Sequence, residues 1–254
     1  EADFDLGLRS NLDSTRALLD ALRARVQGGA APARLVFSSS VAVFGPDAAL
    51  PMPSPVADDT LPAPQSSYGI QKLICEHLIS DFTRKGFIDG RAARLMTVSV
   101  RPGRPNGAAS SFFSGIIREP LAGVESVCPV DASVSHPLAS PGKTVEGLIA
   151  VYEASRDAFQ GRLGMNLPSI NVRVADMLDA LEEVAGSAVR ARVKFVRDER
   201  IAGMVANWPA GATAVRAKRL GLQPDTSFAE IIRQYIADCK ATPGGDAALK
   251  AMAG

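Results

Sequence analysis

The chain has 254 residues, of which 46% are hydrophobic and 22% charged, as in an ordinary globular protein with a sizeable core. Its formal net charge of +1 gives no reason to expect a nucleic acid or an anionic membrane as a partner, and no apolar run approaches the ~20 residues of a membrane span. Its three cysteines (Cys75, Cys128 and Cys239) match no metal or redox spacing, and two histidines are too few for an expected zinc site. We therefore expect reduced thiols, no metal and a cytoplasmic protein.

The first predicted elements are a helix and a strand. Apolar residues recur at near-helical intervals from Phe4 to Leu22, which predicts a helix over residues 4–25. After a loop rich in Gly, Ala and Pro, the run Leu35-Val36-Phe37 has no helical period. Such a run is typical of a buried parallel strand, which we place at residues 34–40.

Three serines at residues 38–40 stand where this strand ends, and a proline-rich surface loop over 46–66 follows. The carboxyl ends of strands are where ligands bind in open α/β sheets. The next predicted helix, over 68–84, carries Tyr68 and Lys72 four residues apart, so both side chains lie on one face of it. The loop arrives just before Tyr68 and can therefore border a pocket.

Ser40, Tyr68 and Lys72 together outline a hydride-transfer site. A tyrosine phenol has a pKa of about 10 and is a poor base at neutral pH. A lysine ammonium one helical turn away favours the phenolate, as does the positive charge of an oxidised nicotinamide. A serine hydroxyl at the neighbouring strand end can hydrogen-bond the substrate oxygen whose proton the tyrosine takes.

The remaining chain alternates short strands and helices. A second β-type run over 94–100 leads into a proline-rich turn from Arg101 to Gly107. An extended segment over 124–134 and a turn at 135–138 precede a helix predicted over 143–159. The further predicted elements are strands over 163–167 and 170–172, a helix over 175–186, a half-exposed strand over 189–196, a final helix behind a Ser227-Phe228 cap, and a loose tail over 241–254.

The combination of these motifs resembles a known family. Ser-Ser-Ser-Val-Ala-Val-Phe-Gly at 38–45, followed by Tyr-Gly-Ile-Gln-Lys at 68–72, is similar to the extended short-chain dehydrogenase/reductases, the NAD-dependent epimerases and dehydratases. The family's catalytic Ser or Thr falls on Ser40, its tyrosine on Tyr68 and its lysine on Lys72. The Tyr-x-x-x-Lys spacing alone occurs by chance on many helices, but the serine strand and the downstream strand stand in the family's order. One departure is a Phe where the family's strand motif usually has Tyr.

The resemblance implies an α/β fold, a Rossmann-like doubly wound parallel sheet with a smaller α/β C-terminal substrate lobe. We assign residues 1–123 to the dinucleotide-binding core, with a helix at 140–160 returning to it. Residues 124–139 and 161–240 are assigned to the substrate lobe. The family's glycine-rich turn, which holds the pyrophosphate, does not occur in this sequence. We therefore expect the first half of the Rossmann unit, on the order of 70–80 residues, to be missing from this chain.

The resemblance also implies contacts with an NAD cofactor. Asn11 matches an asparagine that lies beneath the family's active site and contacts cofactor or an ordered water; the alternative is an ordinary polar residue on a helix. Pro102 matches a residue that contacts the nicotinamide carboxamide, although a proline there can simply end a strand. The other expected cofactor contacts are Ser38, Tyr68 and Lys72, with Lys72 binding the nicotinamide ribose. The choice of NAD over NADP rests on resemblance alone.

The turn after residue 100 differs from that of the sugar-nucleotide enzymes. It resembles a subgroup of the family that oxidises small sugar acids, D-erythronate among them. The resemblance then places Ser40, Tyr68, Arg104 and Asn106 at the substrate. An arginine fork can hold a carboxylate, but a solvated loop arginine is equally compatible with Arg104. The expected reaction is the NAD-dependent oxidation of D-erythronate at C2 to the 2-oxo acid.

Other functions stay open. A nucleotide-sugar epimerase of the same family needs a second lobe that clamps a nucleotide diphosphate, and this lobe is modest in size. A dehydratase usually carries acidic residues after the catalytic Ser or Thr, whereas Val41 and Ala42 follow Ser40. A non-catalytic binding protein with this fold is the remaining alternative, although decay would be expected to erode Tyr68 or Lys72.

The expected partners are a small-molecule substrate and a second copy of the chain, without nucleic acid or membrane. Homodimers in the family often pair the surfaces of the two helices predicted over 4–25 and 68–84 into a four-helix bundle. Ile79 and Phe82 are apolar residues that would suit such an interface.

Overall fold

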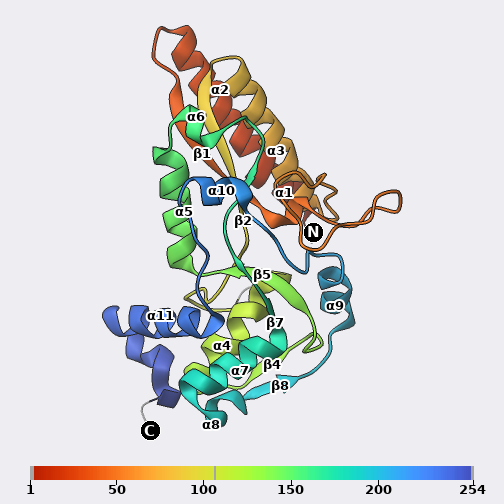
Figure 1. The fold of residues 1–254 in the computed structure, drawn as a ribbon, viewed down its shortest axis with the longest axis vertical. Coiled ribbons are helices and arrows are strands. Elements are labelled where there is room, and N and C mark those ends of the chain that lie inside the picture. The colour runs from red at the N-terminus through yellow and green to blue at the C-terminus, as the bar shows by residue number, and fades with distance from the viewer. Residues whose placement is uncertain (1–2, 106, 253–254) are drawn as a thin grey trace. The chain divides into compact units, whose positions relative to one another are not determined.

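The computed structural model describes residues 3–105 and 107–252, which form two compact units (Figure 1). The first unit comprises the chain up to Met96 together with Thr144–Pro168 and Ala212–Gln223. The second comprises Thr97–Lys143, Ser169–Gly211 and the chain from Pro224 onward. Each unit has its own sheet and its own hydrophobic core.

The predicted N-terminal helix is confirmed, with one irregularity. It consists of α1 (Phe4–Gly7), a π-helical stretch η1 (Leu8–Asp13) and α2 (Ser14–Gln27). Helical turns of the π type are rare in proteins, and those that occur are often found at functional sites. This one contains Asn11, the residue that the family resemblance selects.

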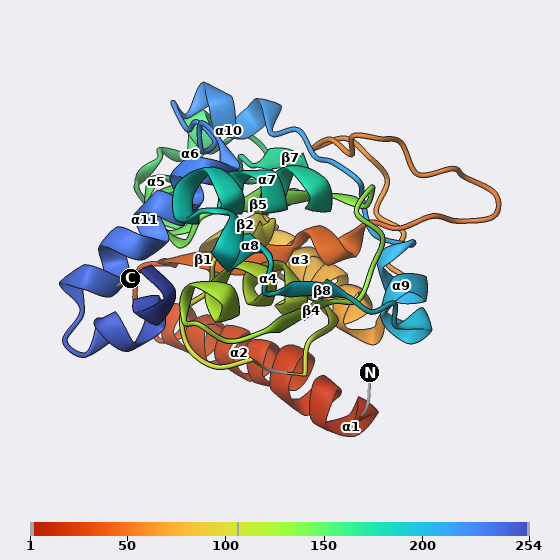
Figure 2. The same cartoon turned by 90° about the horizontal axis from the view of Figure 1, so that it is seen from below.

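The first unit is built on a parallel sheet. Strand β1 (Ala33–Ser40) pairs with β2 (Ile88–Leu95), which pairs in turn with β6 (Met165–Asn166). Helices α2 and α3 (Ser67–Arg84) lie side by side along one face of this sheet in both views (Figures 1 and 2). Helix α5 (Pro141–Glu153) covers the other face (Figure 1). This parallel sheet between helical layers confirms the predicted Rossmann-like α/β class.

Alternate side chains of β1 belong to opposite layers, as the two-residue period of a strand requires. Leu35 and Phe37 pack in a cluster with Leu19 of α2, whereas Val36 packs with Val151 of α5. All three of these β1 residues are half-buried, less than the buried strand that was expected. Among the described strands, β1 pairs with β2 alone.

Strand β2 begins earlier than the strand predicted over 94–100, and the chain then continues as the two-residue β3 (Thr97–Val98). The early part was missed because it contains charges. Arg91 is fully buried, and its guanidinium donates to backbone carbonyls at the end of α5, including that of Tyr152 at 3.0 Å. Asp89 of the same strand also pairs with this guanidinium, at 2.9 Å. A charge that needs further partners from another segment can sit inside a buried strand, and local sequence patterns do not reveal those partners.

The second unit contains a mixed sheet. Strand β5 (Ser135–Ala139) lies between β3, to which it is parallel, and the antiparallel β7 (Ile170–Arg173). The predicted turn at 135–138 is therefore a strand. A separate pair joins β4 (Ser126–Cys128) to β8 (Val193–Phe195), so only the end of the strand predicted over 189–196 is a strand. The remaining elements are η2 (Val41–Val43), η3 (Ala109–Ser111), α6 (Arg156–Phe159), α8 (Ser187–Arg190), α9 (Glu199–Val205), α10 (Val215–Arg219) and η4 (Gly245–Met252).

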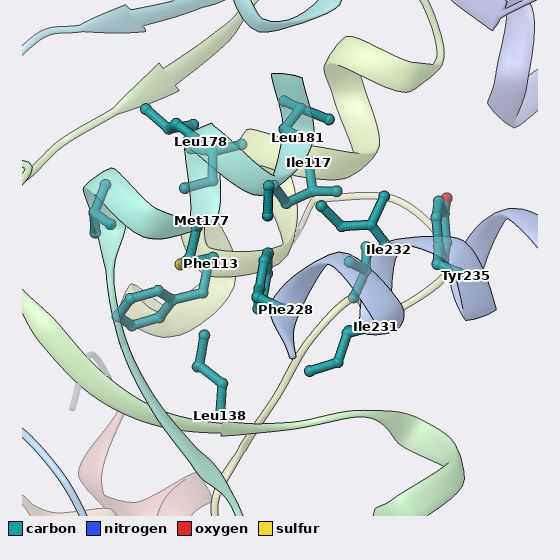
Figure 3. Close-up of a cluster of buried hydrophobic side chains, with 14 of the residues drawn as sticks. Phe113, Ile117, Leu138, Met177, Leu178, Leu181, Phe228, Ile231, Ile232 and Tyr235 are labelled. Atoms are coloured by element: carbon teal, nitrogen blue, oxygen red, sulfur yellow. The ribbon is translucent and has the colours of Figure 1, made fainter. Parts of the chain in front are cut away.

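Three helices close the core of the second unit. They are α4 (Phe112–Leu121), α7 (Val174–Ala185), predicted over 175–186, and α11 (Phe228–Ala241). The predicted cap of α11 is confirmed, because the Ser227 hydroxyl accepts the Glu230 amide. Side chains of the three helices meet Leu138 of β5 in one apolar cluster (Figure 3), whose labelled members are Phe113, Ile117, Leu138, Met177, Leu178, Leu181, Phe228, Ile231, Ile232 and Tyr235.

The boundaries of the units differ from those expected for the two lobes. Residues 97–123 cluster with the second unit, because β3 pairs with β5 and α4 supplies its core. Residues 161–168 belong to the first unit through β6, and 212–223 join it because Ala217 and its neighbours pack with Met165. The expected return of the helix at 140–160 to the first unit holds from Thr144 onward.

Two further expectations need correction. The C-terminal tail is not loose over its described part, since η4 packs on the core of the second unit through Leu249, which is 6% exposed. Ile79 is fully buried against Leu19 within the first unit, so it cannot form a dimer surface. Phe82 is half-buried and makes an edge-to-face contact with Phe87, with ring centroids 5.7 Å apart.

His136 is buried in the second unit beside two aromatic rings. It stacks on Phe113, with ring centroids 5.1 Å apart, and its ring centroid lies 5.5 Å from that of Trp208. Its Nδ1 lies 3.0 Å from the Pro209 carbonyl and its Nε2 lies 2.8 Å from the Thr97 hydroxyl. A carbonyl only accepts, so Nδ1 carries the proton and the Thr97 hydroxyl donates to Nε2. This is a structural, neutral histidine.

Burial lowers the pKa of His136 to about 4. The unfolded chain takes up this proton near pH 6.5, whereas the folded protein does not until about pH 4, so stability falls as the pH falls through that window. We predict a loss of about 2 kcal/mol between pH 7 and pH 5 that the His136→Gln variant does not show. Urea unfolding at both pH values measures it. The control is His77→Gln on the exposed surface of α3, which should keep the acid loss; an equal loss in His136→Gln would contradict the assignment.

Candidate active site

The site predicted from the sequence assembles in the first unit, where the start of α3 meets the end of β1. The Ser66 hydroxyl accepts the Gly69 amide at 3.1 Å and fixes the first turn of α3. A Cβ built on Gly69 would lie 2.1 Å from the carbonyl oxygen of Ala42, just beyond β1. Only glycine permits this approach of backbone to backbone, and it brings Tyr68 to the end of the serine strand.

Ser40 and Tyr68 meet directly, as the motif predicts. The two side chains are hydrogen-bonded, and Ser40 Oγ also accepts the Ala42 amide at 3.1 Å. Tyr68 remains 41% exposed, so a ligand can reach its ring. Burial raises the pKa of Tyr68 and the hydrogen bond with Ser40 lowers it, with burial the larger effect. The direction is opposite to the lowering that the sequence suggested, because burial is set by the fold.

Lys72 is held beside the same strand. Its Nζ donates to the carbonyl of Ser38 at 2.9 Å and lies 4.8 Å from the ring centroid of Phe37 and 5.6 Å from that of Tyr68. Burial lowers the pKa of Lys72, while the neighbouring Cys75 raises it. The ammonium has three donors, and only one is engaged by a residue in the described part of the chain. Ser38 is exposed at this point.

Asn11 lies next to the same helix, and its expected contact with the cofactor or an ordered water stays a prediction. Its side-chain amide donates to Oε1 of Gln71 at 2.8 Å, and its backbone carbonyl accepts a hydrogen bond from the Cys75 thiol at 3.4 Å. Gln71 is 3% exposed and immediately precedes Lys72, yet the sequence analysis did not select it. The signal in the sequence that could have selected Gln71 is a polar residue at a position on the buried side of α3.

The loop before Tyr68 is fastened within the first unit. One Asp58 carboxylate oxygen accepts a hydrogen bond from the backbone amide of Asn166 at 2.8 Å, and the other accepts one from the backbone amide of Arg216 at 3.0 Å. Val56 forms a parallel bridge with Ala212. The second half of the loop at 46–66 is therefore tied to elements far along the chain.

The remaining predicted site residues belong to the second unit. Pro102 and Arg104 are exposed in the turn after β3. The turn begins at Arg101, whose amide donates to the Ser114 hydroxyl at 3.0 Å and whose carbonyl accepts from the Arg118 guanidinium at 2.8 Å. Asn106 lies outside the described residues. The structure thus brings together Ser38, Ser40, Tyr68 and Lys72, and it places Asn11 against Gln71 and Cys75 of the same helix. The roles of these residues, like those of Pro102, Arg104 and Asn106, stay predictions.

Residues 3–105 and 107–252 lack two further features. No three His, Cys, Asp or Glu side chains in these ranges are placed to share a metal ion. No helix there combines the length and the apolar character that crossing a membrane requires.

Comparison with known proteins agrees with this geometry. The chain is 50% identical over 238 residues to the D-erythronate dehydrogenase of Cupriavidus necator, covering 94% of this chain and 71% of that relative. It is 41% identical over 236 residues to the D-erythronate dehydrogenase of Haemophilus influenzae, covering 93% and 72%. The crystal structure of the nucleoside-diphosphate-sugar epimerase from Agrobacterium tumefaciens superposes with a TM-score of 0.87 at 44% identity, over 94% of this chain and 68% of that one.

The family itself follows from two findings. The sequence model of the NAD dependent epimerase/dehydratase family matches residues 5–162, a range that includes Ser40, Tyr68 and Lys72. The two relatives above are similar over nearly the whole chain. The chain belongs to the NAD dependent epimerase/dehydratase family.

Proposed function

We propose that this protein oxidises D-erythronate at C2 to the 2-oxo acid, with NAD as the hydride acceptor. The observation that carries the proposal is the 50% identity, over 94% of the chain, to a protein named D-erythronate dehydrogenase. The contact between Ser40 and Tyr68, with Lys72 beside them, supports a dehydrogenase reaction on a CH–OH group.

The residues at the end of β1 fit the ribose end of a nicotinamide nucleotide. The Lys72 ammonium has donors left for ribose hydroxyls after binding the Ser38 carbonyl, and Ser38 itself is exposed there. Asn11, hydrogen-bonded to Gln71, is the further candidate in the first unit, and Pro102 is the candidate in the second. When bound, the nicotinamide accepts the hydride from C2. The preference for NAD over NADP is part of the proposal.

The chain's own residues handle the proton of the reaction. Tyr68, as the phenolate, takes the proton of the C2 hydroxyl while the carbonyl forms. The Ser40 hydroxyl, already hydrogen-bonded to Tyr68, orients the same substrate oxygen. Lys72 is a cation 5.6 Å from the centre of the Tyr68 ring, and its charge favours the phenolate over the phenol. Arg104 and Asn106 are proposed to hold the substrate, with the Arg104 guanidinium on its carboxylate.

One observation favours a second candidate. The solved relative at 44% identity is titled a nucleoside-diphosphate-sugar epimerase, so epimerisation of a nucleotide sugar is the alternative to test. Within the described residues Val41 and Ala42 follow Ser40, which gives no acidic group for a dehydratase.

We also infer a homodimer and a cytoplasmic location. Leu18 of α2 and Ile70 and Ile74 of α3 are between 39% and 49% exposed, which supports an apolar contact between copies on this helical face in place of Ile79. All three cysteines are free and buried, in keeping with a reducing compartment.

The direct test is an activity assay on the product of the whole reading frame that contains this chain. With NAD and a panel of four-carbon sugar acids, we expect reduced nicotinamide to form with D-erythronate. Nucleotide sugars should give neither reduction nor epimer. Turnover of a nucleotide sugar with inert sugar acids would replace the proposal by the alternative.

Tyr68→Phe tests the base. Because general acid–base catalysis contributes about 10²-fold or more, we expect kcat to fall at least that far while the cofactor still binds. The matched control is Tyr152→Phe on α5, where the ring is 53% exposed and outside the site; it should keep full activity. Steady-state kinetics and cofactor titration measure both, and normal turnover in Tyr68→Phe would remove Tyr68 from the mechanism.

Arg104→Gln tests the carboxylate anchor. Loss of a charge-assisted hydrogen bond should raise KM for D-erythronate by about tenfold or more with a smaller change in KM for NAD. The control is Arg200→Gln, another exposed arginine of the second unit, for which we expect an unchanged KM for the sugar acid. Equal KM values in the two variants would assign the anchor to another residue.

A further inference from the structure

A buried ion pair lies behind the candidate active site in the first unit. Glu76 of α3 and Arg94 of β2 are each 4% exposed. The Arg94 guanidinium donates through Nε to one carboxylate oxygen at 2.9 Å and through a terminal nitrogen to the other at 2.8 Å. A third residue joins them, because the buried Ser39 hydroxyl donates to the same Glu76 Oε1 at 2.5 Å. We call these three residues the Ser39–Glu76–Arg94 network.

The network connects the elements that carry the catalytic set. Ser39 stands between Ser38, whose carbonyl binds Lys72, and Ser40, which bonds Tyr68. Glu76 follows Lys72 by one helical turn on α3, so both side chains lie on the same side of that helix. In the register of the sheet, Arg94 is the direct neighbour of Ser39 on β2. One carboxylate thus ties α3 to two adjacent strands.

The surroundings of the network leave it little room to rearrange. The Arg94 guanidinium lies 4.9 Å from the ring centroid of Phe44. A Cβ built on Gly164 would lie 2.6 Å from Glu76 Oε2 and 2.7 Å from Arg94 Nε, so a glycine backbone closes the site. By contrast, Ser38 is exposed and Tyr68 is 41% exposed. The buried network, and not the exposed contacts of Ser38 and Tyr68, is therefore the rigid connection between α3 and β1.

A net gain in stability does not account for such a pair. Burying two charges costs free energy of about the size that their attraction returns, and apolar replacements are often as stable. What a bidentate pair adds is a fixed geometry, since the guanidinium fork accepts only a narrow range of carboxylate positions. The position of Glu76, and through it that of Ser39, is set in this way.

We propose that the Ser39–Glu76–Arg94 network is a positioning device for catalysis, which holds the end of β1 against α3 so that Ser40 reaches Tyr68. The inference rests on the proposed role of Tyr68 as the base. A displacement of about 1 Å at a reacting group can cost a factor of about 10² in rate, so a fixed junction behind the site bears directly on turnover.

Ser39→Ala is the most selective test. It removes one hydroxyl and deprives no further buried group of its last partner, because Glu76 Oε1 still accepts Arg94 Nε. We expect kcat to fall about tenfold with both KM values within about twofold. The limb of the pH–rate profile that reports deprotonation of Tyr68 should move to higher pH, since the Ser40 hydrogen bond that lowers the pKa of Tyr68 is weakened.

Thr83→Ala is the matched control. The Thr83 hydroxyl accepts the Gly90 amide at 3.1 Å and so joins the same helix to β2, the strand that carries Arg94, but at the end of α3 far from Tyr68. This variant should lower the urea midpoint at least as much as Ser39→Ala and leave kcat and the pH profile unchanged. Both variants are measured in the product of the whole reading frame.

The outcomes separate the two proposals. A fall in kcat and a shifted pH limb in Ser39→Ala alone support the positioning role. Unchanged kcat in Ser39→Ala, or equal falls in both variants, would overturn it while Tyr68→Phe stays inactive. Full activity of Tyr68→Phe would instead overturn the role of Tyr68 on which this inference is built.

Discussion

At the start of α3, the backbone of Gly69 lies against the carbonyl of Ala42, closer than any side chain could approach. This contact sets the register between the helix and β1. It places Tyr68 against Ser40 and, one turn later, Lys72 against the Ser38 carbonyl. The rest of the first unit supports that junction, from the second helix beside α3 to the buried charges beneath it. The candidate catalytic set, drawn from two separate segments of the chain, thus depends on one close approach of main chain to main chain.

Much of this junction could be predicted from the sequence, because its signals are local. A short apolar run that ends in serines predicts β1, and apolar spacing with Tyr68 and Lys72 one turn apart predicts α3 and its reactive face. The start of β2 could not be predicted, because Arg91 and Arg94 look like surface residues. Asp89 is a local partner of Arg91, but the carbonyls of α5 and the carboxylate of Glu76 that satisfy the two guanidiniums come from more distant segments.

The same reasoning explains which features of the site were missed. Residue types and spacing select Ser40, Tyr68 and Lys72, but the pKa of Tyr68 depends on burial, which spacing does not contain. The division into units was misplaced for a related reason. The apolar run at 94–100 reads as one strand, yet its two ends pair with strands of different sheets, and pairing partners are a property of topology.

The burial of Arg91 has a consequence for the order in which the first unit can form. Its guanidinium is held by carbonyls about 60 residues later in the chain, at the end of α5. Until that segment has emerged from the ribosome, Arg91 has its ion pair with Asp89, two residues earlier, but the guanidinium nitrogen that donates to the α5 carbonyls has no partner there. The β1–β2 pair therefore cannot settle into its final core before α5 is available to complete it. Burial of this one guanidinium makes the pairing of two strands wait for a helix further along the chain.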